Sequence, residues 1–212
     1  MKGILIAFEG IDGAGKSTQI KLLAEYLRSQ GHTVCLTAEP TKGQYGQKIR
    51  EAANSYHRLS PDDERQLFVL DRREHLETCI LPAIERGEVV ITDRYLYSSV
   101  AYQGARYDEI GADPATLQHE IYVQNREFAP EADILVYMKL DVDTAISRMK
   151  SGREALDSFE TRNNLVKVAE AFERIVPKHP RVIVLDASQP PQVIANALQE
   201  RLRLYLEKQG YV

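Results

Sequence analysis

The chain is poor in the features that mark several classes of protein. Its 212 residues include two cysteines and no tryptophan. Cys35 and Cys79 lack the spacing of metal ligands, and Cys35 lies within an apolar strand pattern, so we expect it to be a small core residue. No apolar run is long enough to cross a membrane, and the N-terminus enters a strand pattern without a signal peptide. These absences favour a cytoplasmic protein with no membrane partner.

The chain also lacks an excess of basic residues. Its formal net charge is −4 at pH 7, which argues against a protein that binds nucleic acid. Overall acidity leaves an anionic substrate open, because a few local arginines decide that point. Apolar residues make up 43% of the chain, which is enough to fill a sizeable core. Because there are no repeats and no long linker, we expect residues 1–212 to form a single domain.

Strand-like and helical patterns alternate along the chain. This alternation predicts an α/β fold, with helices on both faces of a parallel sheet. Ser60 and Pro61 mark a helix start, and that helix is expected to run to Arg86 with a kink at Pro82. Ligands of such sheets bind beyond the carboxyl ends of the strands. The expected strands are 4–8, 33–38, 89–92, 134–140 and 182–185.

One segment carries more information than any other. It matches the phosphate-loop pattern G-x-x-x-x-G-K-[ST], is followed by Thr18, and reads Gly10-Ile11-Asp12-Gly13-Ala14-Gly15-Lys16-Ser17. The segment joins an expected strand to an expected helix, so its backbone amides can converge on phosphate oxygens. Lys16 places a charge near the β- and γ-phosphates, and the Ser17 hydroxyl can ligate Mg²⁺. We therefore predict that the chain binds a nucleoside triphosphate; a plain glycine-rich turn would leave Lys16 unexplained.

Two further segments carry charges that suit phosphoryl transfer. Asp93 and Arg94 follow the third expected strand, where the acid suits Mg²⁺ and the arginine can bind phosphate oxygens. A surface ion pair is the alternative. A basic segment at about 147–162, which includes Arg153, can close over the triphosphate as a lid and exclude water. A solvated helix face fits that segment equally well.

The candidate residues for an acceptor substrate are more dispersed. Phe68 and Arg72 share one helix face and can stack on and hydrogen-bond a base, although a core phenylalanine with an exposed arginine fits the same spacing. Gln103 can read the edge of a base. Asp12 puts a carboxylate among anion-binding groups. It can bind a sugar hydroxyl or a metal-bound water, and an Asx turn that stabilises the loop is the alternative. Glu39 follows the second expected strand.

These residues resemble the thymidylate kinase family over nearly the whole chain. The loop from Phe8 to Gln19 resembles the family's phosphate loop closely. Further motifs follow in the family's order, namely Leu67-Phe68, Arg72-Arg73-Glu74-His75-Leu76, Asp93-Arg94-Tyr95, Ser98-Ser99, Ala101-Tyr102-Gln103-Gly104 and Asp186-Ala187-Ser188-Gln189. The resemblance implies a P-loop kinase fold with a five-stranded parallel sheet, a homodimer, and phosphoryl transfer from ATP to dTMP with Mg²⁺.

The resemblance also implies roles for individual residues. Phe68 stacks on thymine, Arg72 and Gln103 hydrogen-bond to it, and Asp12 takes the 3′-hydroxyl of deoxyribose. Two arginines hold the acceptor phosphate. The implied substrate-binding set is Asp12, Glu39, Arg50, Phe68, Arg72, Arg94, Ser99 and Gln103. The implied catalytic set is Lys16, Asp93, Arg94 and Arg153, with Ser17 and Asp93 as the magnesium ligands.

The chain departs from the family's motifs at three informative positions. Ala38 and Ser158 stand where the family has arginines, and Tyr97 replaces an aspartate. Three functions therefore stay open: a thymidylate kinase, a P-loop kinase that acts on a different nucleoside monophosphate or a deoxynucleoside, and a non-catalytic nucleotide-binding module.

Overall fold

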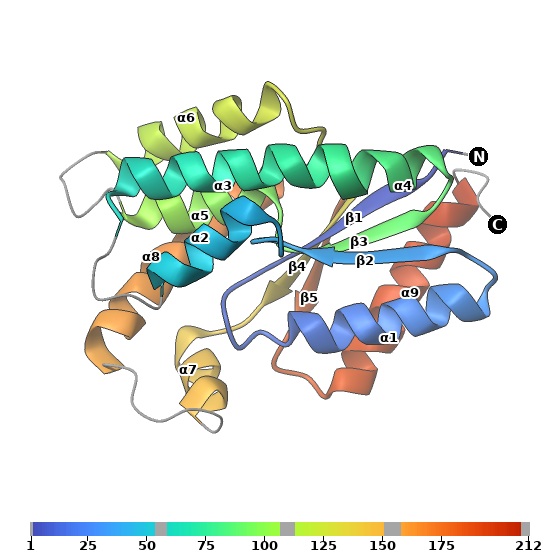
Figure 1. Cartoon of the computed structure of the whole chain (residues 1–212). Coiled ribbons are helices and arrows are strands. Elements are labelled where there is room, and N and C mark those ends of the chain that lie inside the picture. Colours follow the sequence, from blue (N-terminus) through green and yellow to red (C-terminus); the bar gives the residue numbers. More distant parts are fainter. Residues whose placement is uncertain (1, 54–58, 107–112, 151–157, 209–212) are drawn as a thin grey trace.

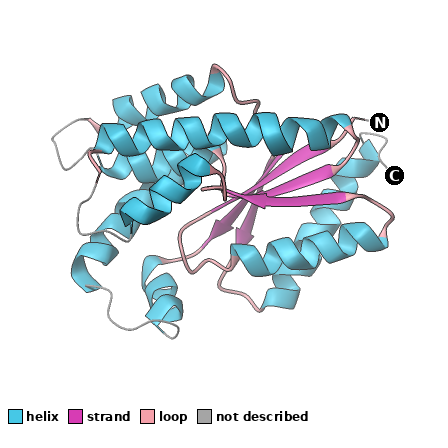
Figure 2. Ribbon diagram, in the orientation of Figure 1, coloured by secondary structure: helices cyan, strands magenta, loops and turns pink. Residues whose placement is uncertain are grey.

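A computed structural model describes residues 2–53, 59–106, 113–150 and 158–208. Five parallel strands in the order β2-β3-β1-β4-β5 form a central sheet, which helices cover on both faces (Figures 1 and 2). Each strand contains most of one predicted run, so the predicted fold class and strand count are confirmed. The strands are β1 (Ile4–Glu9), β2 (Val34–Ala38), β3 (Val89–Asp93), β4 (Ile134–Lys139) and β5 (Val182–Asp186).

Burial along the strands follows their position in the sheet. β1 pairs with β3 and β4, and all six of its residues are buried. Its continuous apolar run is explained by this central position, because both faces of the strand are covered. β2 and β5 form the two edges, and each has an exposed apolar side chain, Leu36 and Val184.

The helices form two layers. In Figure 1, α1 (Lys16–Ser29) and α9 (Pro191–Lys208) pack together against one face of the sheet. Ile20, Leu23 and Leu27 are among the buried residues of α1, and their helical spacing explains why this face packs inward. The remaining α-helices are α2 (Gln44–Ala53), α3 (Pro61–His75), α4 (Leu81–Glu85), α5 (Leu96–Arg106), α6 (Pro114–Arg126), α7 (Val142–Lys150) and α8 (Ser158–Ile175).

The long helix predicted from Ser60 to Arg86 is interrupted, but not by a kink at Pro82. The start is confirmed, because the Ser60 side chain accepts a hydrogen bond from the backbone N–H of Asp63. A π-helical segment, η1 (Leu76–Ile80), then lies between α3 and α4. Pro82 has no N–H to donate and its ring crowds the preceding turn, so the wider π turn directly before it relieves an α-helical clash.

The parallel register brings the predicted site residues to one edge of the sheet. Phe8 of β1 and Ala38 of β2 both pair with Asp93 of β3. The chain segments that leave these three strands therefore begin side by side, although they are far apart in the sequence. These segments carry the phosphate loop, Glu39 and Arg94.

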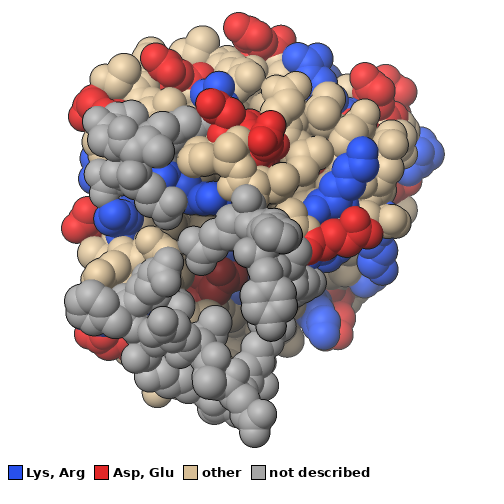
Figure 3. Space-filling view, turned by 60° about the vertical axis from the view of Figure 1, so that its left-hand side comes forward, with Lys and Arg blue, Asp and Glu red and all other residues tan. Residues whose placement is uncertain are grey.

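The position of Cys35 differs from the prediction that it is a core residue. Cys35 is half-buried on the edge strand β2 rather than in the core, and its sulfur lies 3.8 Å from that of Cys79 in η1. Among the described residues, none of the helices combines the length and apolarity needed to traverse a lipid bilayer. On the face turned forward in Figure 3, basic and acidic side chains of the described residues are interspersed.

Candidate active site

The phosphate loop links the carboxyl end of β1 to the first turn of α1. Gly10 and Gly13 have φ values of 141° and 81°, in the left-handed region that favours glycine. A Cβ atom at either position would lie 2.7 Å from a backbone oxygen, that of Met138 for Gly10 and that of Ala145 for Gly13. Both glycines are therefore required by conformation and by close packing against β4 and α7.

A cavity of about 270 Å³ opens at the N-terminus of α1. A Cβ atom placed on Gly15 would meet nothing within 4 Å, so the loop leaves room at that point. Unpaired N–H groups and the positive end of the helix dipole favour an anion there. Of the predicted loop residues, Gly10, Ile11 and Ala14 do not line the cavity, and the last two are buried in the core. The lining residues are Asp12, Gly13, Gly15, Lys16, Ser17, Thr18, Ala38, Glu39, Asp93 and Arg94.

Lys16 is a buried cation at the wall of this cavity. Its ammonium group donates to the backbone oxygens of Gly10 and Ile11, each at 3.1 Å. Burial and the positive charge of Arg94 lower the pKa of Lys16 to about 8, although nearby acids oppose that shift. A desolvated cation of this kind interacts strongly with phosphate oxygens, because water screens it less.

Ser17 and Asp93 offer oxygens that suit Mg²⁺. The Ser17 hydroxyl donates to Oδ2 of Asp93 at 2.9 Å, so the two predicted ligands lie together. The other carboxylate oxygen of Asp93 is buried and has no hydrogen-bond partner among the described residues. A hydroxyl beside a partly unsatisfied carboxylate fits the oxygen-rich coordination that Mg²⁺ requires next to substrate phosphates.

Arg94 stands between this cavity and a second pocket. Its backbone has a φ of 74°, uncommon for a residue with a side chain. The guanidinium donates to Oδ1 of Asp12 at 2.7 Å and to the Tyr102 hydroxyl at 3.0 Å. The alternative of a surface ion pair between Asp93 and Arg94 is therefore wrong, because the ionic partner of Arg94 is Asp12. Burial by itself would raise the pKa of Asp12, but Arg94 and Lys16 outweigh burial and lower it.

The second pocket, of about 180 Å³, lies beyond Arg94 and contains most of the predicted substrate residues. We call it the acceptor pocket. Arg50 is the exception, because its guanidinium donates to the backbone oxygens of Pro40 and Thr41, and it lines neither cavity. Its predicted contact with an acceptor phosphate stays a prediction. The pocket is lined by Asp12, Glu39, Pro40, Glu64, Phe68, Arg72, Arg94, Ser98, Ser99, Tyr102 and Gln103.

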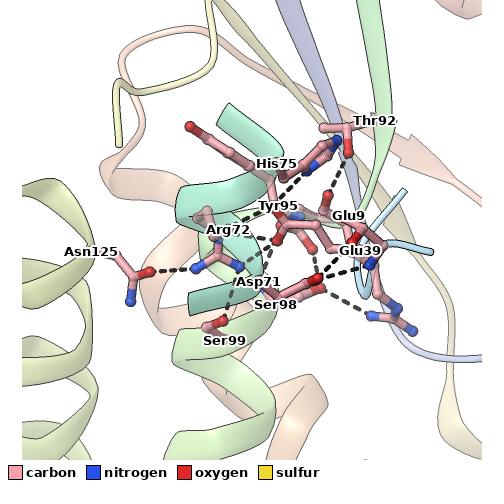
Figure 4. A network of polar contacts seen from close by, with 12 residues as sticks. Glu9, Glu39, Asp71, Arg72, His75, Thr92, Tyr95, Ser98, Ser99 and Asn125 are labelled. Atoms are coloured by element: carbon pink, nitrogen blue, oxygen red, sulfur yellow. Dashed lines mark hydrogen bonds and ion pairs between the residues drawn. The ribbon is translucent and has the colours of Figure 1, made fainter. Parts of the chain in front are cut away.

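A buried ion pair forms the floor of the acceptor pocket (Figure 4). The Arg72 side chain is 1% exposed, and its guanidinium lies 2.5 Å from a carboxylate oxygen of Glu39. It also donates to Ser99 Oγ at 3.0 Å and to the side-chain oxygen of Asn125. Burial alone would raise the pKa of Glu39, but Arg72 and His75 prevail and lower it. The alternative of an exposed arginine beside Phe68 is therefore wrong, and Arg72 is held in a fixed orientation.

Two supporting residues were missed by the sequence analysis. Asn125 is fully buried and reaches Arg72 from α6, a helix that carries no recognisable motif. Glu9 is also fully buried and accepts hydrogen bonds from the backbone N–H groups of Tyr95 and Ser98. Burial raises the pKa of Glu9 to about 7 despite these bonds. An acid at the end of an apolar strand was a signal for Glu9, whereas nothing in the sequence singled out Asn125.

The three departures from the family's motifs have different outcomes. Ala38 lines the phosphate cavity. Tyr97 is 1% exposed and packs against the rings of Tyr122 and His179, at centroid distances of 6.1 and 5.9 Å, so it is a core residue outside both cavities. Nothing is shown for the side chain of Ser158.

The predicted lid at 147–162 is described only in part. Arg148 of α7 donates to the backbone oxygen of Ala187 at 2.9 Å and contacts the oxygen of Gly13 at 3.5 Å, so one basic residue of the segment touches the phosphate loop. Arg162 pairs with Asp143 at 2.8 Å on the surface. Arg153 lies outside the described residues.

Comparisons with known proteins agree with the geometry. A family model described as Thymidylate kinase matches residues 8–198. A thymidylate kinase of Desulfotalea psychrophila is 44% identical over 174 residues, which are 82% of this chain and 82% of that protein. One from Xanthomonas campestris pv. campestris is 40% identical over 210 residues, which are 95% of this chain and 87% of that protein. The matched residues include both cavities.

Proposed function

This chain belongs to the thymidylate kinase family, and from that premise we propose how its two cavities divide the family's reaction. The enzyme transfers a phosphoryl group from ATP to dTMP, which gives ADP and dTDP. The cavity at the phosphate loop takes the triphosphate of ATP, and the acceptor pocket takes dTMP. The observation that carries this assignment is the shared wall, because Asp12, Glu39 and Arg94 line both cavities.

On the donor side, the chain supplies charge and orientation rather than a general base. The attacking phosphate oxygen of dTMP is already anionic at neutral pH, so the main tasks are alignment and charge neutralisation. We assign phosphate contacts to the loop amides and to Lys16, and a contact with the transferred group to Arg94. Ser17 and Asp93 would hold Mg²⁺, which neutralises phosphate charge when bound. Arg153 is proposed to add a further charge from the lid.

On the acceptor side, the proposal follows the chemistry of thymine. Phe68 offers a ring for stacking, and the clamped guanidinium of Arg72 offers a hydrogen-bond donor. The side-chain oxygen of Gln103 is buried and has no partner among the described residues, and it matches a base that presents an N–H donor. We assign to Asp12, which lines the pocket, a hydrogen bond from the sugar. Ser99 fixes Arg72 beside the base.

We also propose the remaining properties that the family suggests. These are a homodimer, a cytoplasmic location, and one domain over residues 1–212. Size-exclusion chromatography with light scattering measures the first directly, and a monomer at micromolar concentration would contradict it.

An assay of acceptor preference tests the proposed function. Purified protein is incubated with ATP, Mg²⁺ and one of dTMP, dUMP, CMP, AMP or thymidine, and ADP formation is measured. We expect clear preference for dTMP and no transfer by the Lys16→Ala variant, which controls for a contaminating kinase. Preference for any other acceptor would overturn the assignment of the acceptor pocket.

A further inference from the structure

Two thiols lie close together outside both nucleotide cavities. The sulfur atoms of Cys35 and Cys79 are 3.8 Å apart although the residues are separated by 44 positions in the sequence. Both cysteines are free and half-buried, so reagents in solution can reach them. Cys35 belongs to the edge strand β2 and Cys79 to the π-helical segment η1. The pair therefore brings together two elements that are far apart in the sequence.

A third cavity lies beside this pair. It measures about 290 Å³, and Cys79 is part of its wall. Its other lining residues are Thr37, Thr41, Gly43, Glu74, His75 and Thr78. None of these residues lines the phosphate cavity or the acceptor pocket. This cavity gives a small thiol reagent a route to Cys79 that does not pass through the nucleotide site.

The elements that carry the two sulfurs can accommodate a bond between them. A disulfide needs a sulfur separation of about 2 Å, so the atoms must approach by less than 2 Å. β2 is an edge strand that pairs only with β3, and η1 departs from regular α-helical hydrogen bonding. Both elements are less constrained than the buried strands of the sheet centre.

We propose that Cys35 and Cys79 form a reversible intramolecular disulfide with an oxidant of the glutathione disulfide class. One protein thiolate attacks glutathione disulfide, which forms a mixed disulfide and releases one glutathione thiolate. The second protein thiolate then attacks the protein sulfur of that mixed disulfide. The Cys35–Cys79 bond forms as the bond to glutathione breaks. In total two protein thiols are oxidised, two protons are released to solvent, and one glutathione disulfide is reduced to two glutathione thiolates.

The rate of this exchange depends on the ionisation of the thiols. Burial, the neighbouring Cys79 and the negative charge of Glu88 raise the pKa of Cys35 to about 11, while Arg86 opposes the shift. The thiolate is the reactive form, so attack by the Cys35 sulfur is slow at neutral pH and accelerates as the pH rises. Slow exchange at neutral pH keeps the reduced form long-lived unless the oxidant is abundant.

The disulfide also has a consequence for the acceptor pocket, which rests on the proposed function. His75 lies between the two cysteine-bearing elements, with one ring nitrogen 2.6 Å from Thr37 Oγ1 and the other 3.0 Å from a carboxylate oxygen of Glu39. Moving β2 against η1 displaces these contacts and with them the Glu39–Arg72 ion pair. The oxidised protein should therefore bind dTMP more weakly, and ATP should be affected less because Arg72 lines the acceptor pocket alone.

Thiol counting and mass spectrometry test whether the bond forms. Folded protein is treated with excess glutathione disulfide at pH 8.5, and we expect the loss of both free thiols and of the mass of two hydrogen atoms. The matched variants Cys35→Ser and Cys79→Ser should instead stop at a single glutathione adduct. Dithiothreitol should reverse both products. Two stable glutathione adducts on the folded wild type, or two thiols that stay free while urea-unfolded protein oxidises, would overturn the proposal.

Steady-state kinetics test the link to the acceptor pocket. We expect oxidation to raise KM for dTMP severalfold and KM for ATP by a smaller factor, and the double variant Cys35→Ser/Cys79→Ser to be insensitive to the oxidant. Identical KM values for dTMP in the oxidised and reduced wild type would overturn this link. A reduced enzyme that does not phosphorylate dTMP at all would instead contradict the proposed function, so the two failures are distinguishable.

Discussion

The phosphate cavity and the acceptor pocket share a wall but are built from different parts of the chain. The first is formed largely by one contiguous loop, whose glycines adopt left-handed φ values and lead into the N-terminus of α1. The second is formed by side chains from the end of β2 and from α3 and α5, and α6 supports it through Asn125. Backbone donors are fixed once the loop folds, whereas side-chain donors need partners of their own to stay in place.

This difference separates general from selective recognition. Backbone amides at a helix N-terminus recognise any phosphate group, because all phosphates present the same oxygens. The acceptor pocket is proposed to distinguish bases, and its floor is a buried ion pair whose members depend on each other. Substitutions in the first region should therefore affect chemistry with little loss of stability, and substitutions in the second should affect both.

Replacement of Lys16 tests the first half of this comparison and should give the largest effect. We expect Lys16→Ala to lower kcat on the order of a thousandfold, because a desolvated charge next to the phosphates is lost. Circular dichroism and the urea midpoint should change little. Lys21→Ala, on the exposed side of the same helix, is the matched control and should retain activity. A Lys16→Ala enzyme with near-normal turnover would remove this residue from the mechanism.

Replacement of Glu39 tests the second half of this comparison, the claim that the acceptor pocket depends on its buried ion pair. Glu39→Gln leaves the guanidinium of Arg72 buried without its counter-charge, so the free energy of unfolding should fall by about 3–5 kcal/mol. KM for dTMP should rise as well. Urea unfolding followed by circular dichroism measures the loss, and Glu85→Gln at an exposed site of α4 is the control. Equal stability of the two variants would show that the pair is dispensable and would break the comparison.

Glu9 lies where the two regions meet, and its ionisation predicts a smaller, pH-dependent effect. Its pKa is raised from 4.5 to about 7 in the folded protein, so between these values the folded state keeps a proton that the unfolded state has released. The resulting stability is fully present below pH 4.5 and is lost as the pH rises through 7.

Glu9→Gln cannot show this loss, because the amide does not ionise. The difference in unfolding free energy between variant and wild type should therefore grow, by at most about 3 kcal/mol, from pH 4.5 to above 7. Urea titrations across this range measure it. Parallel pH profiles for the two proteins would refute the raised pKa.

The smallest expected effect is the uptake of protons by the protein when ATP binds. The pKa of Lys16 is about 8, and adjacent phosphates should raise it. At pH 8 the binding of ATP should therefore take up to about half a proton, and uptake through Lys16 should fade toward pH 6.5. Calorimetry in two buffers of different ionisation enthalpy measures this number. The Lys16→Ala variant should show no such difference between the buffers.

The parts of the molecule that could be predicted from the sequence are those encoded locally. The strands were predicted to within about one residue at either end, because strands of a parallel sheet are short, largely apolar runs. The phosphate loop could also be predicted, because its glycines and Lys16 lie in one short contiguous motif. Pro82 did signal an irregularity in its helix, but the sequence could not show that a π turn would absorb it.

The rest depends on contacts between distant segments. The pairing of Arg94 with Asp12 spans 82 positions, and Arg72 reaches Asn125 across 53. No local pattern encodes such pairs, because they arise only after the sheet and helices have packed. The resemblance implied a role for Arg72 but did not identify the side chains that hold it in place. The proximity of Cys35 and Cys79 could not be predicted from the sequence either.

The shared wall has one more consequence. Asp12, Glu39 and Arg94 line both cavities, so in the proposed complex a ligand in one cavity alters the surroundings of a ligand in the other. By thermodynamic reciprocity, the factor by which bound dTMP changes the affinity for ATP must equal the factor by which ATP changes the affinity for dTMP. The order in which the two nucleotides arrive is therefore a matter of rates alone, and the energy of the ternary complex is the same by either route.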